Sequence, residues 1–252
     1  MIDHPRGGYR FLAGPPFLSF AVAAQPGFAI ERAVFRNPQP DLNAGLARIQ
    51  TYLQERNRPI QAVCGLEFRQ FLPEQAPRAV FDEFNRGHIE RLTRADMLVD
   101  GKVPVARTNV VMDAGRPAAE SGLHAFSYTV PAADRQGAPD FVLAAIPEVR
   151  FTDGQELVIA EGGTSESALR EKIDFILDTA ATRLTGIGAS WQDATGIQLY
   201  SVADLKPYFA QMLARMGAGG WRGVQWHHAL PPVGPSIMEL DVRAVHAEFM
   251  ID

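Results

Sequence analysis

Two arginines stand at matching places in the two halves of this chain, and each is followed by a side chain that can carry a proton. Arg107 precedes His124 and Arg222 precedes Glu239, and the members of each pair are 17 positions apart. A guanidinium binds a carboxylate through two parallel charge-assisted hydrogen bonds without changing its own charge. A glutamate or histidine within reach of a water can transfer protons, typically for ~10²–10⁴-fold in rate. These residue types suit hydrolysis on a small carboxylate.

Each of these side chains also has an ordinary structural interpretation. An arginine at the start of a strand commonly lies in solvent or in a salt bridge, and Glu239 alternates with Leu240 as a solvent-facing carboxylate would. His124 is suited to act as a general base near neutral pH, but it is equally consistent with a half-buried histidine of structural role. Trp221 and Trp226, on either side of the second arginine's strand, suit the wall of a conjugated ligand site or a packed core.

Other kinds of site find little support in the sequence. His227 and His228 are adjacent, so on a strand they point to opposite faces and cannot bind one metal together. The glycines at 162–163 lack the longer pattern of a phosphate-binding loop, and no Gly-x-Ser-x-Gly motif is present. Cys64 lies in an apolar run, which favours a buried thiol over a nucleophile. We therefore expect no metal.

Composition sets limits on partners and compartment. The 252 residues are 46% hydrophobic and 21% charged, with a net charge of -5. The absence of basic runs argues against nucleic acid as a partner. One cysteine excludes an intramolecular disulfide, which is natural in a reducing compartment. The apolar stretch 11–24 is interrupted by Pro15-Pro16 and is too short to span a bilayer. We expect a cytoplasmic protein that does not bind a membrane.

The elements that must position the candidate residues recur in order. Helical spacing predicts helices over 42–53, 76–92, 166–184 and 205–216. Alternation predicts strands over 17–24, 29–35, 60–68, 103–112, 123–130, 194–202, 221–228 and 237–245. The segment 151–159 predicts a turn at Asp153-Gly154 and a strand. The small and polar segment 132–139 predicts a linker. Both halves read β-β-α-β-α-β-β, which predicts two domains over 1–131 and 140–252.

The second half resembles the Rid (YjgF-type) family of enamine and imine deaminases over about 149–245. In that family an arginine precedes the penultimate strand, a Leu-Pro turn follows, and a glutamate sits in the last strand; Arg222, Leu230-Pro231 and Glu239 have that order. The first half is similar through Pro104-Val105-Ala106-Arg107-Thr108, although His124 replaces the family's glutamate. The segment 220–223 also departs from the usual Pro-Ala-Arg-Ser/Thr.

The resemblance implies an α+β fold of two tandem chorismate-mutase-like, Rid-type domains, each a mixed sheet with helices on one face. It also implies clefts between neighbouring domains and a homotrimer or hexamer. Arg222, with Arg107 as the equivalent in the first half, would then hold a substrate carboxylate. Glu239 would activate the water, with His124 in the corresponding position. No cofactor is needed, because an imine is already electrophilic.

The resemblance thus predicts a hydrolytic deaminase acting on an enamine or imine of a small carboxylate. Both 2-aminoacrylate-like and 2-aminomuconate-like substrates fit, and the tandem build and the tryptophans favour the larger one. Two alternatives stay open: a non-catalytic carboxylate-binding or scaffold protein, and a chorismate-processing enzyme on a related fold. The last would need a second basic group in the cleft of the arginine.

Overall fold

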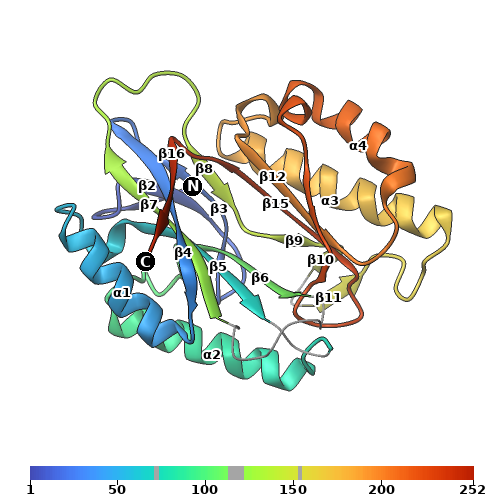
Figure 1. The fold of residues 1–252 in the computed structure, drawn as a ribbon, viewed down its shortest axis with the longest axis horizontal. Coiled ribbons are helices and arrows are strands. Elements are labelled where there is room, and N and C mark those ends of the chain that lie inside the picture. The colour runs from blue at the N-terminus through green and yellow to red at the C-terminus, as the bar shows by residue number, and fades with distance from the viewer. Residues whose placement is uncertain (71–73, 113–121, 153–154) are drawn as a thin grey trace.

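The strands of the molecule join into one large curved sheet. The computed structural model describes residues 1–70, 74–112, 122–152 and 155–252. Fourteen strands form the sheet, whose main order is β13-β12-β15-β8-β3-β6-β5-β7-β4-β16. A separate hairpin pairs β10 with β11. In Figure 1 the strands occupy the centre, with α1 and α2 below and α3 and α4 to the right.

The described strands range from two to twelve residues in length. Those from the first half are β1 (Ile2–His4), β2 (Tyr9–Ala13), β3 (Ser19–Ala24), β4 (Phe28–Gln39), β5 (Val63–Gln70), β6 (Ala106–Met112) and β7 (Gly122–Pro131). Those from the second half are β8 (Phe141–Leu143), β9 (Ile146–Pro147), β10 (Val149–Thr152), β11 (Gln155–Val158), β12 (Gly196–Ser201), β13 (Gln225–His227), β14 (Ala229–Leu230), β15 (Met238–Ala244) and β16 (Ala247–Ile251).

Four helices cover the sheet: α1 (Leu42–Gln54), α2 (Arg78–Arg94), α3 (Glu166–Gly186) and α4 (Phe209–Met216). Asp41 caps α1, since its side chain accepts hydrogen bonds from the backbone N–H groups of Asn43 and Ala44. Ser165 caps α3 through the N–H of Ala168. The four helices predicted from hydrophobic spacing are confirmed, with α2 and α4 starting a few residues later than predicted.

The predicted fold of two tandem Rid-type domains, each with its own small sheet, is wrong. β8 lies between β3 of the first half and β15 of the second, so backbone hydrogen bonds run from one half to the other. β16 then returns to pair in parallel with β4. The helices and the longer strands were predicted in the right order, but β1, β2, β8, β9, β14 and β16 were missed. The order along the chain also does not specify which strands pair across the halves. Whether 1–131 and 140–252 are separate domains stays a prediction.

The two helix pairs bury separate apolar clusters. α1 and α2 pack with β5 and β7 through residues such as Ile49, Leu66 and Phe126. α3 and α4 pack with β12 and β15, and this second cluster also takes in Ala21 of β3. None of the described helices is long and apolar enough to cross a membrane.

Candidate active site

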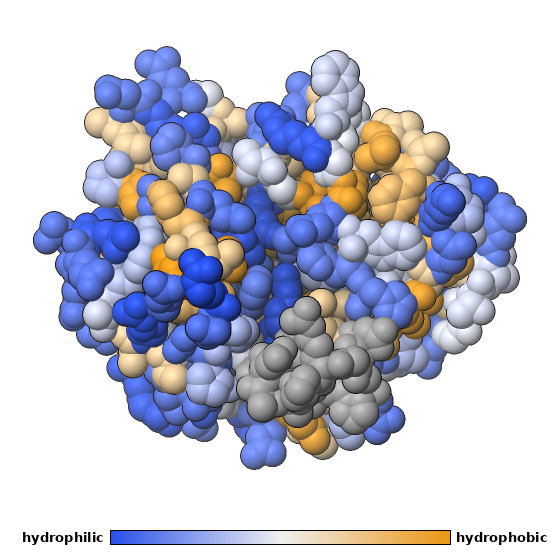
Figure 2. Space-filling view, in the orientation of Figure 1, coloured by the Kyte–Doolittle hydropathy of each residue, from blue (hydrophilic) through white to orange (hydrophobic). Residues whose placement is uncertain are grey.

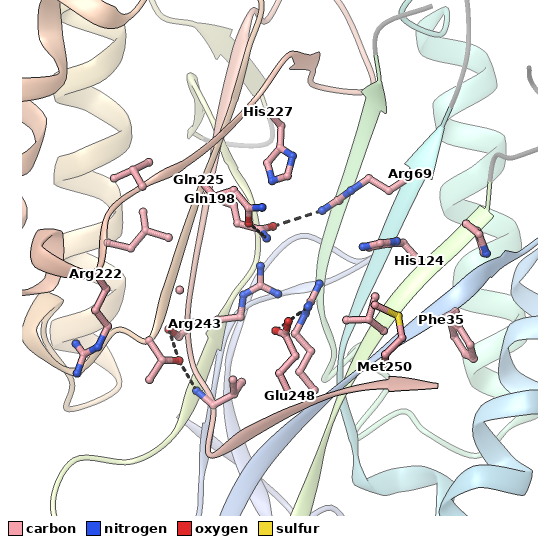
Figure 3. Close-up of a pocket in the computed structure, with 18 of the residues that line it drawn as sticks. Phe35, Arg69, His124, Gln198, Arg222, Gln225, His227, Arg243, Glu248 and Met250 are labelled. Carbon is pink, nitrogen blue, oxygen red and sulfur yellow. Dashed lines mark hydrogen bonds and ion pairs between the residues drawn. The ribbon is translucent and has the colours of Figure 1, made fainter. Parts of the chain in front are cut away.

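Two cavities bring together the residues singled out from the sequence. The larger, here called the central cleft, has a volume of about 1080 Å³ and opens between the two halves of the sheet. Figure 2 shows hydrophilic residues around a hollow at the centre of this face, and Figure 3 shows the cleft in close-up. Its polar lining comprises Arg32, Arg36, Asn37, Arg69, His124, Thr195, Gln198, Arg222, Gln225, His227, Arg243 and Glu248.

The charges at the floor of the central cleft are already paired with one another. Buried Glu67 accepts hydrogen bonds from Arg32 at 2.6 and 2.7 Å and from Arg243 at 2.7 Å. Arg69 donates to the hydroxyl of Tyr200 at 3.0 Å. Burial opposes ionisation of Glu67, but the guanidinium groups of Arg243 and Arg32 hold its pKa well below the ordinary value. This network binds the two halves of the sheet and leaves little uncompensated charge for a ligand.

Two of the predicted site residues, His124 and Arg222, lie in the central cleft. Burial, with Arg69 nearby, lowers the pKa of His124 to about 4, so this imidazole is neutral at pH 7. Arg222 donates to the carbonyl of Ala194 at 2.9 Å, and Figure 3 shows it directed away from Arg69 and Arg243. The structure therefore does not bring Arg222 and Glu239 into one cavity.

The two predicted tryptophans do not form an aromatic wall. Trp221 is 90% exposed and Trp226 is 37% exposed. The indole of Trp226 donates to the carbonyl of Ser201 at 3.0 Å and packs 5.7 Å from the ring of Phe209.

The second cavity, here called the arginine pocket, has a volume of about 410 Å³ and does bring Arg107 and Glu239 together. β3 pairs with β6 only between Ser19 and Ala106, so past this point β6 continues without a β3 partner. The pocket lies there, between α2, α3 and the β10–β11 hairpin. Its lining includes Arg107, Asn109, Arg183, Glu239 and four aromatic rings, those of Phe17, Phe20, Phe81 and Phe151.

Arg107 is buried and hydrogen-bonded, but it has no carboxylate partner among the described residues. It is 3% exposed, and its Nη2 donates to Asn85 of α2 at 2.7 Å. Its guanidinium lies over the rings of Phe17 and Phe84 at 5.1 and 5.2 Å, which favours a cation there. Burial lowers its pKa to about 9, an effect that Glu239 partly offsets, so it stays charged at pH 7.

Arg183 is a second buried cation facing the same pocket. It belongs to the last turn of α3, is 8% exposed and donates to the carbonyl of Ala144 at 3.2 Å. The ring of Phe20 lies 4.3 Å from its guanidinium carbon. Burial lowers its pKa, too, to about 9, again partly offset by Glu239. Among the described residues, neither Arg107 nor Arg183 forms an ion pair with a carboxylate.

Glu239 lines the arginine pocket together with Arg107 and Arg183. It lies on β15, is 5% exposed, and its Oε2 is buried without a hydrogen-bond partner. Burial raises its pKa well above the ordinary value; Asp241 and Glu148 add to the shift, and Arg107 opposes it. Glu148 is itself fixed by Lys172 at 3.2 Å and by the N–H of Ile237 at 2.6 Å. Glu239 is therefore able to hold a proton near neutral pH.

Sequence reasoning missed Arg183 and the phenylalanine walls. A signal for Arg183 was present, because it follows Ile176 and Ala180 along the apolar stripe of α3, where a charged residue is unexpected. No such signal marks Phe20 or Phe151, because a strand phenylalanine is ordinarily part of a core.

A pocket of this kind, in which two buried guanidinium groups and one buried carboxyl lie among aromatic rings, has the features of a small-molecule enzyme site. The family model "2-aminomuconate deaminase CnbZ" matches residues 1–249, and the chain belongs to that family. A curated relative, 2-amino-5-chloromuconate deaminase from Comamonas testosteroni, is 34% identical over 247 residues, which is 97% of this chain and 96% of the relative. These matches overturn the assignment to the Rid family.

Two solved structures are similar to this chain at low sequence identity. A chorismatase structure has a TM-score of 0.50 at 11% sequence identity, covering 90% of this chain and 77% of that chain. A cyanuric acid hydrolase has a TM-score of 0.44 at 12% identity, covering 87% and 68%. At such low identity the chorismatase shows the fold alone. The coarser prediction, an enzyme that acts on a C–N bond, is confirmed by the family.

Proposed function

We propose that this protein removes the amino group of a 2-aminomuconate-like dicarboxylate by hydrolysis in the arginine pocket. The observation that carries the proposal is the presence in one cavity of two buried arginines, without an ion-pair partner among the described residues, and a buried glutamate whose pKa is raised. The names of the matching family and of its curated relative support the same substrate class.

The two guanidinium groups account for the binding of a substrate with a carboxylate at each end. Arg107 reaches the pocket from β6 and Arg183 from α3, so they face it from different elements. A dianion would supply the negative charge that both lack, and each carboxylate would accept charge-assisted hydrogen bonds. The rings of Phe17, Phe20 and Phe81 suit a flat conjugated chain between the two ends.

Glu239 accounts for the proton transfers. As an acid it delivers a proton to a carbon of the amino-diene, which turns the enamine into an iminium ion. The resulting carboxylate takes a proton from a water as that water attacks the C–N carbon, and then returns it to the nitrogen. The hydroxyl proton of the resulting carbinolamine passes to the Glu239 carboxylate as the C–N bond breaks. Ammonia leaves, a carbonyl remains and the acid form of Glu239 is restored, so one water is consumed for each ammonia released. General acid–base help of this kind contributes ~10²–10⁴-fold in rate.

Ammonia release from 2-aminomuconate, generated in situ, tests the activity. The Arg183→Met variant should lower kcat/KM by about 10- to 100-fold, because it removes charge-assisted hydrogen bonds to one carboxylate. Arg170→Met is the control, since Arg170 lies on the same helix but is exposed and paired with Glu166.

Two ligands without an amino group isolate the role of the second arginine. The intact protein should bind trans,trans-muconate more tightly than sorbate, which has the same trans,trans diene but one carboxylate. That preference should disappear in Arg183→Met. Lack of ammonia release by the intact protein, or an unchanged preference in the variant, would contradict the proposal.

A further inference from the structure

Unsatisfied polar atoms gather at the arginine pocket, and Asn109 contributes the most. Within the described part of the chain, buried side-chain atoms without a hydrogen-bond partner include Asn85 Nδ2, Arg107 Nη1, Glu239 Oε2 and both amide atoms of Asn109. Asn109 is 3% exposed and lines the pocket. An orphaned buried donor or acceptor destabilises a fold by about 1–3 kcal/mol, so native proteins rarely keep one without a use.

The position of Asn109 does not call for an amide on structural grounds. β6 is a central strand, and its neighbours Val110 and Val111 are buried apolar residues of the type such strands favour. Thr108, which points to the opposite face, is satisfied by a hydrogen bond to Asp241 at 3.1 Å. An apolar side chain of the same size at 109 would remove two unsatisfied atoms.

The strand geometry places Asn109 beside the anchor for a carboxylate. Residues two apart on a strand extend from the same face, about 7 Å apart along it, so Asn109 and Arg107 both face the pocket. The side chain of asparagine is shorter than that of arginine and carries an acceptor and a donor without charge. In a 2-amino acid the nitrogen is attached to the carbon next to the carboxylate, so a carboxylate on Arg107 leaves the nitrogen close to its anchor.

We propose that Asn109 binds the amino nitrogen of the substrate, through acceptance of an N–H bond by Oδ1, and so selects a 2-amino dienoate over an unsubstituted one. This assignment rests on the proposed function. A neutral acceptor suits the task, because the nitrogen gains positive charge when the enamine becomes an iminium ion, while a second carboxylate beside Arg107 would compete with the substrate for that guanidinium.

The test separates recognition of nitrogen from recognition of carboxylates. Asn109→Leu should lower kcat/KM for 2-aminomuconate by about 10- to 100-fold, because the substrate N–H loses its acceptor. Its Kd for cis,cis-muconate, which has no nitrogen, should stay within about threefold of the original. The melting temperature should rise by about 2–4 °C, because two orphaned atoms are replaced by a packed side chain.

Asn109→Asp provides a second variant, since it keeps an acceptor oxygen of the same size. It should retain more activity than Asn109→Leu at a pH where the new carboxyl is protonated. Equal losses in turnover and in muconate binding, or a fall in melting temperature for Asn109→Leu, would overturn the assignment to nitrogen. Failure of the intact protein to release ammonia would instead remove the proposed function, and this inference with it.

Discussion

At the scale of single residues, the account depends on the protonation of Glu239. Asp241 and the fixed charge of Glu148 lie near it, and Arg107 only partly offsets them. Burial, the largest cause of the raised pKa, and these charges therefore favour the protonated form of the carboxyl, which an acid catalyst requires. The pKa values of Arg107 and Arg183 are lowered because both cations are buried. A dianionic ligand would supply the negative charge that stabilises both guanidinium groups.

This protonation predicts a pH dependence with a definite sign. The pKa of Glu239 is raised, so the active acid form is present below that pKa and is lost as the pH rises through it. We expect kcat/KM, which reports on the free enzyme, to fall along an alkaline limb set by this group. The limb should vanish in Glu239→Gln, together with ~10²–10⁴-fold of the rate.

The control for that measurement is Glu161→Gln, since Glu161 also lines the arginine pocket but is exposed. It should keep both the rate and the limb. A Glu239→Gln variant with the original rate and the original pH profile would show that this carboxyl takes no part in the reaction.

At the scale of elements, Glu67 on β5 joins three strands. It pairs with Arg32 of β4 and with Arg243 of β15, and all three side chains are buried. We expect Glu67→Gln to lower the free energy of unfolding by about 3–5 kcal/mol, because it leaves buried cations without their partner. Urea denaturation measures the change.

Glu248→Gln is the matched control, because Glu248 pairs with the same Arg32 but its side chain is 55% exposed. Its effect should be about 0–1 kcal/mol. The lowered pKa of Glu67 also predicts how stability depends on pH. The contribution of Glu67 to the free energy of unfolding is present above its unfolded-state pKa of about 4.3 and is lost as the pH falls below that value. Similar losses in both variants, or a Glu67→Gln protein equally stable at pH 7, would contradict this role.

The elements also show what the sequence could and could not predict. Helix spacing and capping are local properties, so α1 and α3 were predicted almost to their ends. Arg107 and Glu239 were singled out by spacing, and they do share a pocket. Arg222 has the same spacing, but it lies in a short 3₁₀ turn (Gly217–Arg222) rather than in a strand, which turns it away. Pairing of β3 with β8 across the halves is a non-local property that no local pattern encodes.

At the scale of the whole molecule, the continuous sheet implies that the two halves stabilise each other. Ala21 and Ala23 of β3 belong to the same apolar cluster as Leu177 of α3. β16 covers the edge of β4 with five paired residues. We expect neither 1–131 nor 140–252 to fold alone, with each giving a broad thermal transition by circular dichroism. The intact chain, as the control, should unfold in one cooperative step.

A cooperative transition for either fragment would instead support the predicted division into two domains. The predicted homotrimer or hexamer and the cytoplasmic location stay predictions.

The most direct test of the central claim is a crystal structure of the intact protein with cis,cis-muconate, which lacks the amino group and so cannot be deaminated. We expect one carboxylate within hydrogen-bond distance of Arg107, the other at Arg183, and Glu239 beside the diene. Muconate bound in the central cleft at Arg69 and Arg243, with the arginine pocket left without it, would contradict the account.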